Sequence, residues 1–262
     1  MDFFSNNKII VIKIGSSTLT AKGKINKSWF KSFVKDVVRL KKQGKQVIIV
    51  TSGAIALGRK YLNINQNSEV SLKEKQALAS IGQVDLILAY KEFFSKHKII
   101  ASQILLSLDD TEDKKRFLNT KNTISVLLQR NIIPIINEND TVATEEIQYG
   151  DNDRLSAKIA GMVGADLLIL LSDIAGLYDS DPKTNPNAKF IKTIDKIDGK
   201  IKAMAGGKGS SIASGGMKTK IEAAIIANES NCKTIICFGK RKAPLSQLNK
   251  KDALYSAFIP PR

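Results

Sequence analysis

The sequence predicts an α/β protein with a largely parallel central sheet, and three observations lead to this fold class. Short apolar runs rich in β-branched residues recur along the chain, and segments with helical periodicity lie between the first five of them. No fixed-period repeat or low-complexity linker interrupts this alternation. Continuous apolar strands that alternate with amphipathic helices are typical of a parallel sheet covered on both faces. The 262 residues are enough to bury a sizeable core.

The expected strands are the six apolar runs, at residues 9–14, 47–50, 99–106, 132–136, 167–171 and 234–238. A first helix is expected where apolar residues step by three and four between positions 29 and 40, before Gly44 acts as a stop signal. The other helical patterns cover residues 71–97, 118–130, 153–163 and an alanine-rich stretch from Glu222. Two Asx-Pro pairs make residues 178–187 a turn-rich surface segment.

The formal net charge of +16 suggests a protein that binds polyanions. Two observations argue against nucleic acid, which stays a minor alternative. The basic residues are 34 lysines and only 7 arginines, whereas specific phosphate and base recognition favours arginine. The excess is also uneven, because residues 132–180 carry 2 basic and 9 acidic side chains between two basic flanks.

Several protein classes are excluded by what the sequence lacks. No apolar run approaches the ~18 residues of a membrane span, and the polar start does not resemble a secretion signal. The two cysteines, Cys232 and Cys237, are too few for a disulfide framework, so a cytoplasmic location without a membrane is expected. The single histidine, His97, lies in a charged run, and this excludes a serine–histidine triad and a cysteine–histidine zinc site.

Polar residues follow the first two expected strands, where ligands bind in open α/β sheets. Lys13 lies inside an apolar strand before Gly15, and burying its charge is costly unless an anion meets it. An edge-strand lysine that faces solvent is the alternative. The Ser52-Gly53 pair precedes a helical run and could present N–H groups to an anion, or simply cap the helix.

Two later segments add an acidic patch and a glycine-rich loop. Residues 138–153 contain six acidic side chains and no lysine or arginine, which suggests a site for a cationic group around Asp140, Asn152 and Asp153. Residues 206–220 form a glycine-rich loop before a helix, suited either to phosphate binding or to a flexible linker. A histidine-free site with lysines, glycine loops and aspartates matches phosphoryl transfer, above all to a carboxylate that is already ionised at neutral pH.

Six segments in the same order resemble the glutamate 5-kinase family of the amino acid kinase superfamily, over essentially the whole chain. They are residues 13–17 (KIGSS), 51–55 (TSGAI), 76–83 (QALASIGQ), 136–140 (INEND), 150–153 (GDND) and 214–220 (SGGMKTK). The resemblance implies a three-layer α/β/α sandwich, the amino acid kinase fold. It also implies ATP- and Mg²⁺-dependent phosphorylation of the γ-carboxylate of L-glutamate, the first step of proline biosynthesis. The metal would be held by the nucleotide phosphates, with no metal site in the protein.

The resemblance also assigns residue roles. Lys13 and Lys220 match the lysines that neutralise the transferred phosphoryl group, and Asp153 matches the aspartate that orients them. The implied glutamate contacts are Ser52, Asp140 and Asn152. The implied ATP contacts are Lys13, Ser172, Asp173, Ser214, Gly215, Gly216, Met217, Lys218, Thr219 and Lys220. Ala213-Ser214 replaces the Gly-Thr pair common in the family.

The resemblance predicts one amino acid kinase domain over residues 1–262, with a glutamate-binding part at about 1–160 and an ATP-binding part at about 161–262. The C-terminal PUA domain of many relatives is not expected. A homo-oligomer and feedback inhibition by proline are implied. Another kinase of the superfamily, acting on acetylglutamate, aspartate or a nucleoside monophosphate, is the alternative. Asp140 favours an acceptor with a free ammonium group over acetylglutamate.

Overall fold

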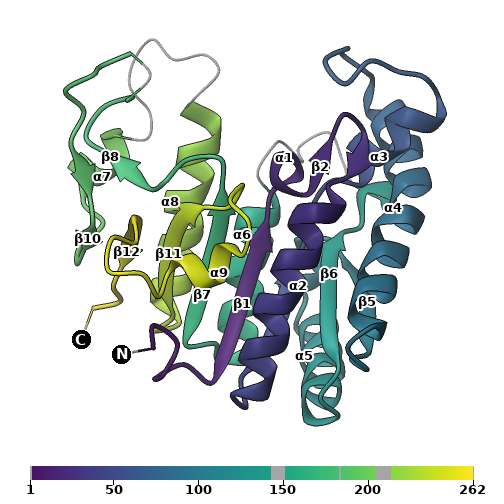
Figure 1. Ribbon diagram of the computed structural model, residues 1–262, viewed down its shortest axis with the longest axis horizontal. Helices are drawn as coiled ribbons and strands as arrows, with labels where there is room; N and C mark the ends of the chain where they lie inside the picture. The colour runs from purple at the N-terminus through teal and green to yellow at the C-terminus, as the bar shows by residue number, and fades with distance from the viewer. Residues whose placement is uncertain (1, 143–150, 183, 205–213, 262) are drawn as a thin grey trace.

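The computed structural model describes residues 2–142, 151–182, 184–204 and 214–261, and these form one eight-stranded sheet. Its strands are β1 (Ile9–Ile14), β4 (Gln46–Val50), β5 (Ala101–Leu106), β6 (Ile133–Glu138), β7 (Leu167–Ser172), β10 (Thr193–Ile194), β11 (Lys233–Phe238) and β12 (Tyr255–Phe258). The spatial order is β10-β12-β11-β7-β1-β4-β6-β5 (Figure 1). All neighbours are parallel except β11 and β12. The mainly parallel sheet is therefore confirmed.

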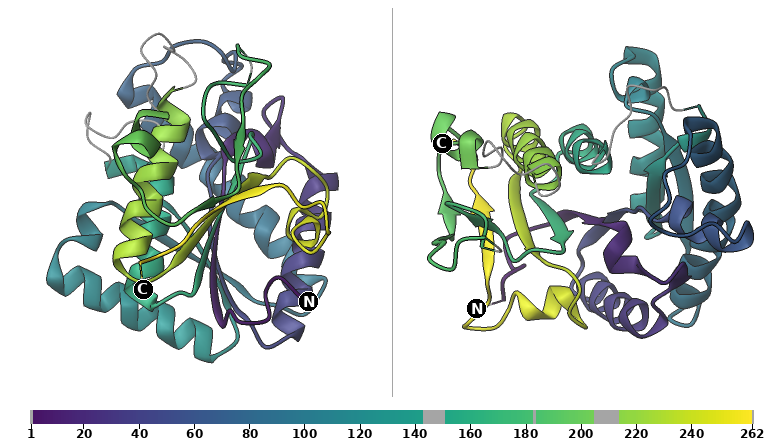
Figure 2. Two further views of the ribbon diagram at one scale, coloured as in Figure 1. Left: turned by 90° about the vertical axis from the view of Figure 1, so that its left-hand side faces the viewer. Right: turned by 90° about the horizontal axis from the view of Figure 1, so that it is seen from above.

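Helices cover both faces of this sheet, which makes a three-layer α/β/α sandwich (Figure 2). One face packs against α2 (Lys27–Lys42), α4 (Leu72–Ser95) and α9 (Pro244–Gln247). The other packs against α5 (Lys114–Gln129), α6 (Asp151–Val163) and α8 (Ser214–Glu229).

The central strand β1 contributes to both cores. Ile10, Ile12 and Ile14 lie in the core with α2 and α4, whereas Val11 lies in the core with α6 and α8. Successive side chains of a strand point to opposite faces, so Lys13 shares the face of Val11. The lysine of the central strand is therefore directed towards α6 and α8.

Shorter elements connect the layers. They are α1 (Ser16–Leu19), β2 (Thr20–Ala21), β3 (Lys24–Ile25), α3 (Ala54–Tyr61), η1 (Asp109–Thr111), η2 (Asp140–Val142), β8 (Leu177–Tyr178), β9 (Phe190–Ile191) and α7 (Gly199–Met204). Each of the six strands predicted from sequence begins and ends within two residues of the bounds of an observed strand. Among the described helices, none has the length and apolarity that crossing a membrane requires.

Two predictions at helix starts need correction. α8 begins at Ser214, eight residues before the alanine-rich pattern from Glu222. Ser52 does not cap α3, because the N-cap residue is Gly53, which has a φ of 111° and makes no side-chain capping bond. The left-handed backbone at Gly53 turns the chain from β4 into α3 and leaves the Ser52 hydroxyl available for another partner.

Helices α3 and α4 lie close together through two glycines. A Cβ atom on Gly82 of α4 would overlap the carbonyl oxygen of Ala54 and lie 2.5 Å from the nitrogen of Gly58. A Cβ atom on Gly58 of α3 would overlap the carbonyl oxygen of Leu78. Only glycine permits this approach at the two positions, so α4 holds the first turn of α3 directly against its own backbone.

Candidate active site

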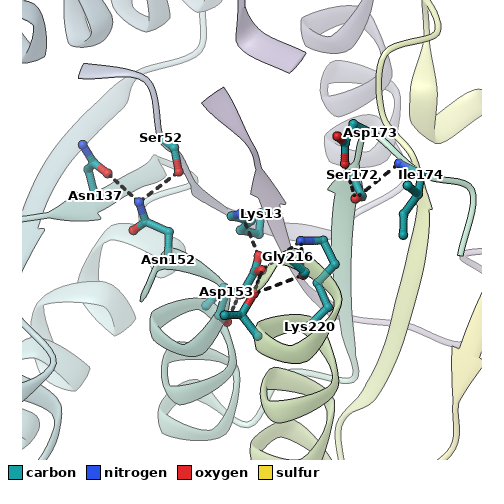
Figure 3. A network of polar contacts seen from close by, with 12 residues as sticks. Lys13, Ser52, Asn137, Asn152, Asp153, Ser172, Asp173, Ile174, Gly216 and Lys220 are labelled. Atoms are coloured by element: carbon teal, nitrogen blue, oxygen red, sulfur yellow. Dashed lines mark hydrogen bonds and ion pairs between the residues drawn. The ribbon is translucent and has the colours of Figure 1, made fainter. Parts of the chain in front are cut away.

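The carboxylate of Asp153 lies between two lysine side chains that come from opposite ends of the sequence (Figure 3). Lys13 Nζ, at the carboxyl end of β1, is 2.7 Å from Asp153 Oδ1, and Lys220 Nζ of α8 is 3.0 Å from Asp153 Oδ2. All three residues are buried. β1 is paired on both sides, so Lys13 does not lie on an edge strand and its charge is met by an anion. The three residues predicted to be catalytic are thus brought together.

The two lysines determine the ionisation of Asp153. Burial alone would raise the pKa of this carboxyl group, but the charges of Lys13 and Lys220 and their hydrogen bonds outweigh burial and lower the pKa to about 2. Thr219 also donates a hydrogen bond to Oδ2, at 2.9 Å. Asp153 is therefore an anion at neutral pH, and the cluster carries one net positive charge.

A second polar cluster lies one residue earlier on α6 (Figure 3). Asn152 Nδ2 donates to Ser52 Oγ at 2.9 Å and to Asn137 Oδ1 at 3.1 Å. Asn137, in β6, donates through its own Nδ2 to Gln83 Oε1 of α4 at 2.8 Å. Asn152 Oδ1 is buried and has no hydrogen-bond partner among the described residues. Ser52 and Asn152, two predicted substrate contacts, are therefore neighbours. Asn152 Oδ1 can accept a further hydrogen bond at this place.

Asp140, the third predicted substrate contact, begins η2 beyond the end of β6. It lines a cavity of about 330 Å³ together with Gln83, Glu138 and residues of α4 and β5. Residues 143–150, inside the segment expected to form the glutamate pocket, lie outside the described residues.

The predicted nucleotide contacts fall in two places at the same end of the sheet. Ser172 ends β7, the neighbour of β1, and its Oγ lies 3.3 Å from Asp173 Oδ1 and accepts a long hydrogen bond from Ile174 N. Gly216, Met217 and Lys218 lie in the first turns of α8, where Lys218 is exposed. The side chain of Ser214 and the surroundings of Gly215, like all of residues 205–213, lie outside the described part of the chain.

The sequence reasoning did not assign a role to three residues that the geometry brings into the site. Asn137 and Gln83 lie in segments that carry the family resemblance, but neither was counted as a site residue. Thr51 is buried and accepts a hydrogen bond from Tyr90 OH of α4 at 2.9 Å. Burial raises the pKa of Tyr90, so its hydroxyl stays protonated and donates. The apolar surroundings of Tyr90 gave no signal that it reaches the end of β4.

Comparison with known proteins bears on the identity of this site. The model of the amino acid kinase family matches residues 8–238, which span the strands and helices that carry both clusters. The chain belongs to the amino acid kinase family. Among solved structures, the UMP kinase of Ureaplasma parvum has a TM-score of 0.64 at 17% identity and covers 97% of this chain and 99% of its own. The isopentenyl phosphate kinase of T. acidophilum has a TM-score of 0.64 at 15% identity, covering 96% and 100%. These likenesses establish the amino acid kinase fold.

Curated relatives in sequence are closer. The chain is 51% identical over 252 residues to a glutamate 5-kinase of Rhizobium etli and 52% identical over 252 residues to one of Sinorhizobium fredii. The aligned region is 96% of this chain and 64% of each relative. The chain therefore spans about two thirds of the length of these glutamate 5-kinases.

Proposed function

We propose that this chain transfers the γ-phosphoryl group of ATP to the γ-carboxylate of L-glutamate and forms L-glutamyl 5-phosphate, in the first step of proline biosynthesis. One observation carries the proposal: consecutive residues of α6 belong to the two clusters. Asn152 reaches Ser52, and Asp153 holds Lys13 and Lys220. An acceptor held by the cluster of Ser52, Asn137 and Asn152 would lie beside two ammonium groups that can neutralise a transferred phosphoryl group. The glutamate 5-kinases that match nearly the whole chain support the same acceptor.

The roles of the residues follow from their charges. The γ-carboxylate of glutamate is ionised at neutral pH, so its attack on phosphorus needs no general base. Asp153 has a pKa of about 2 and is bound to two lysines, which suits it to orienting them rather than to moving protons. Lys13 and Lys220 stabilise the negative charge on the phosphoryl oxygens as the bond to the leaving ADP breaks.

The first turns of α8 suit the phosphates of ATP. α8 has 16 residues, and the N-terminus of such a helix offers backbone N–H groups and a partial positive charge to an anion. Lys218 adds a positive charge nearby. Among the residues that the structure describes, no group of three or more His, Cys, Asp or Glu side chains could hold a metal ion. The phosphates of ATP are proposed to hold Mg²⁺, and the metal would supply further neutralisation of their charge. Ser172 and Asp173 are proposed as the remaining nucleotide contacts.

The acceptor pocket is proposed to bind the two ends of glutamate differently. Asp140 is suited to pair with the ammonium group, whereas the Ser52 hydroxyl can donate to a carboxylate. We further propose that residues up to about 160 bind glutamate and later residues bind ATP, and that proline inhibits at or near the glutamate site. A cytoplasmic homo-oligomer is the expected form of the enzyme.

A hydroxylamine assay tests the acceptor. Protein, ATP, Mg²⁺ and hydroxylamine are incubated with L-glutamate, N-acetylglutamate, L-aspartate or UMP in parallel, and the hydroxamate formed from an acyl phosphate is measured. ADP release is followed in the same tubes, because UMP gives no acyl phosphate. We expect hydroxamate with glutamate. Product with acetylglutamate or aspartate but not glutamate, or ADP release with UMP alone, would contradict the proposal.

A further inference from the structure

The cluster of Ser52, Asn137 and Asn152 is joined by a polar side chain from helix α4, Gln83. We call these four residues the acceptor cluster. Gln83 is half-buried in the wall of the 330 Å³ cavity, and its Oε1 accepts a hydrogen bond of 2.8 Å from Asn137 Nδ2. The close glycine contact between Gly82 and the first turn of α3 fixes α4 at this point. The position of Gln83 relative to the cluster is therefore set by backbone packing.

In the structure Gln83 presents its Oε1 to Asn137, and the next two amide groups are turned to match. A side-chain amide has a donor end and an acceptor end. Because Asn137 Nδ2 faces Gln83, Asn137 Oδ1 faces Asn152 and accepts from its Nδ2 at 3.1 Å. The same Nδ2 donates to Ser52 Oγ at 2.9 Å. Both donor contacts of Asn152 are thus made inside the protein.

The consequence is a defined acceptor atom in the pocket. Asn152 Oδ1 is left buried without a hydrogen-bond partner among the described residues. A buried carbonyl oxygen without a partner is costly unless a ligand supplies a donor. If Asn137 were turned end for end, its NH₂ group would face the NH₂ group of Asn152, and that amide would have to turn as well. An NH₂ group would then face the ligand in place of the oxygen.

We propose that Gln83 is a positioning residue that acts through Asn137 to hold Asn152 with its carbonyl oxygen towards an N–H donor of the acceptor. The inference rests on the proposed function, in which the donor is the ammonium group of an amino acid. It adds a residue of α4, remote from the reacting atoms, to the set that determines acceptor affinity. The amide chain favours acceptors that present an N–H donor at this place.

The test replaces the acceptor oxygen of Gln83 while keeping its size. Gln83→Met has a similar length and cannot accept from Asn137, so we expect the KM for glutamate to rise about tenfold, with kcat within twofold and the KM for ATP unchanged. Gln83→Glu still offers an oxygen to Asn137 Nδ2, so its KM should stay within about threefold of the wild type. Lys91→Met is the matched control, because it introduces the same side chain at an exposed position of α4 about two helical turns beyond Gln83 and should leave both KM values unchanged.

Glutamate affinity measured by calorimetry without turnover gives a second readout, and thermal unfolding identifies a variant that has lost its fold. An unchanged KM in Gln83→Met, or equal damage in Gln83→Met and Gln83→Glu, would overturn the role of Gln83. If the wild type phosphorylates a different acceptor, the proposed function is wrong. The same variants are then compared on that acceptor, and a KM ratio that depends on an oxygen at position 83 still supports the positioning role.

Discussion

Replacing Asp153 by asparagine removes the charge that holds the two lysines, and its effect on stability can be worked from the pKa. The folded-state pKa of about 2 lies below the usual value of 3.8. That difference corresponds to about 2–3 kcal/mol of interaction with the ionised form. Breaking a buried ion pair costs about 3–5 kcal/mol. We therefore expect Asp153→Asn to lower the free energy of unfolding at pH 7 by about 2–5 kcal/mol and to abolish most of the proposed kinase activity.

The pH dependence separates this electrostatic effect from a simple packing defect. A carboxyl group whose folded-state pKa is depressed stabilises the protein fully above its unfolded-state pKa, and the stabilisation is lost as the pH falls towards the folded-state pKa. Between pH 6 and pH 3 the wild type should lose about 1 kcal/mol more than Asp153→Asn, because only the wild type protonates this group on unfolding.

Urea unfolding followed by circular dichroism at a series of pH values measures the difference. Asp252→Asn is the matched control, because Asp252 is an exposed aspartate remote in sequence from the cluster. Its curve should run parallel to that of the wild type. If the curves of the wild type and Asp153→Asn are parallel between pH 6 and pH 3, the ion-pair reasoning is refuted.

Three further substitutions test other parts of the site. Lys220→Ala should lower kcat by about 10²–10³ fold, the loss typical for one electrostatic stabiliser. The variant should stay folded because Asp153 keeps Lys13, although it loses the stability that the second buried ion pair supplies. Retained turnover would remove Lys220 from the proposed catalytic residues. Asp140→Ala should raise the KM for glutamate about 10–100 fold with kcat largely kept, and an unchanged KM would contradict pairing with the ammonium group. Gly82→Ala should cost about 1–3 kcal/mol of stability in urea unfolding, because its methyl group would overlap Ala54. Gly199→Ala, whose methyl group meets no atom within 4 Å, should be close to neutral. Equal effects would contradict the close helix contact.

The sheet was predictable from sequence where strands are fully buried, and less so elsewhere. The run at residues 9–14 coincides with β1, because five of its six residues are β-branched and apolar and suit a strand buried on both faces. β5 begins at Ala101 rather than at residue 99. Ile99 donates back to Phe94 after Lys98 adopts a φ of 58°, so the last helical turn extends into the apolar run. Apolarity alone does not reveal that turn.

Helix starts were less predictable because local composition opposed them. The glycine pair at 215–216 has low helix propensity, and it indicated a loop although α8 already begins at Ser214. α5 begins at Lys114, four residues before the predicted pattern, because Asp113 caps the helix by accepting from Arg116 N. Capping bonds and tertiary packing decide these boundaries more than periodicity does.

The candidate site was likewise predictable from sequence only in part. A lysine in an apolar strand already implied an anionic partner, and Asp153 is that partner. The chain from Gln83 through Asn137 to Asn152 joins α4, β6 and α6, and no spacing in the sequence indicates that these three amides meet. Their contact depends on the glycine-mediated packing of α3 and α4, which is a property of the fold.

The adjacency of Asn152 and Asp153 has a geometric consequence for how the enzyme can move. Neighbouring Cα atoms are 3.8 Å apart across one rigid peptide unit. The backbone positions of Asn152, the proposed anchor of the acceptor, and of Asp153, the anchor of the two lysines, therefore cannot separate. Any displacement of α6 shifts both anchors by the same amount. We therefore expect a movement of α6 to carry the proposed anchor of the acceptor and the anchor of the two lysines together, so that their relative position is kept.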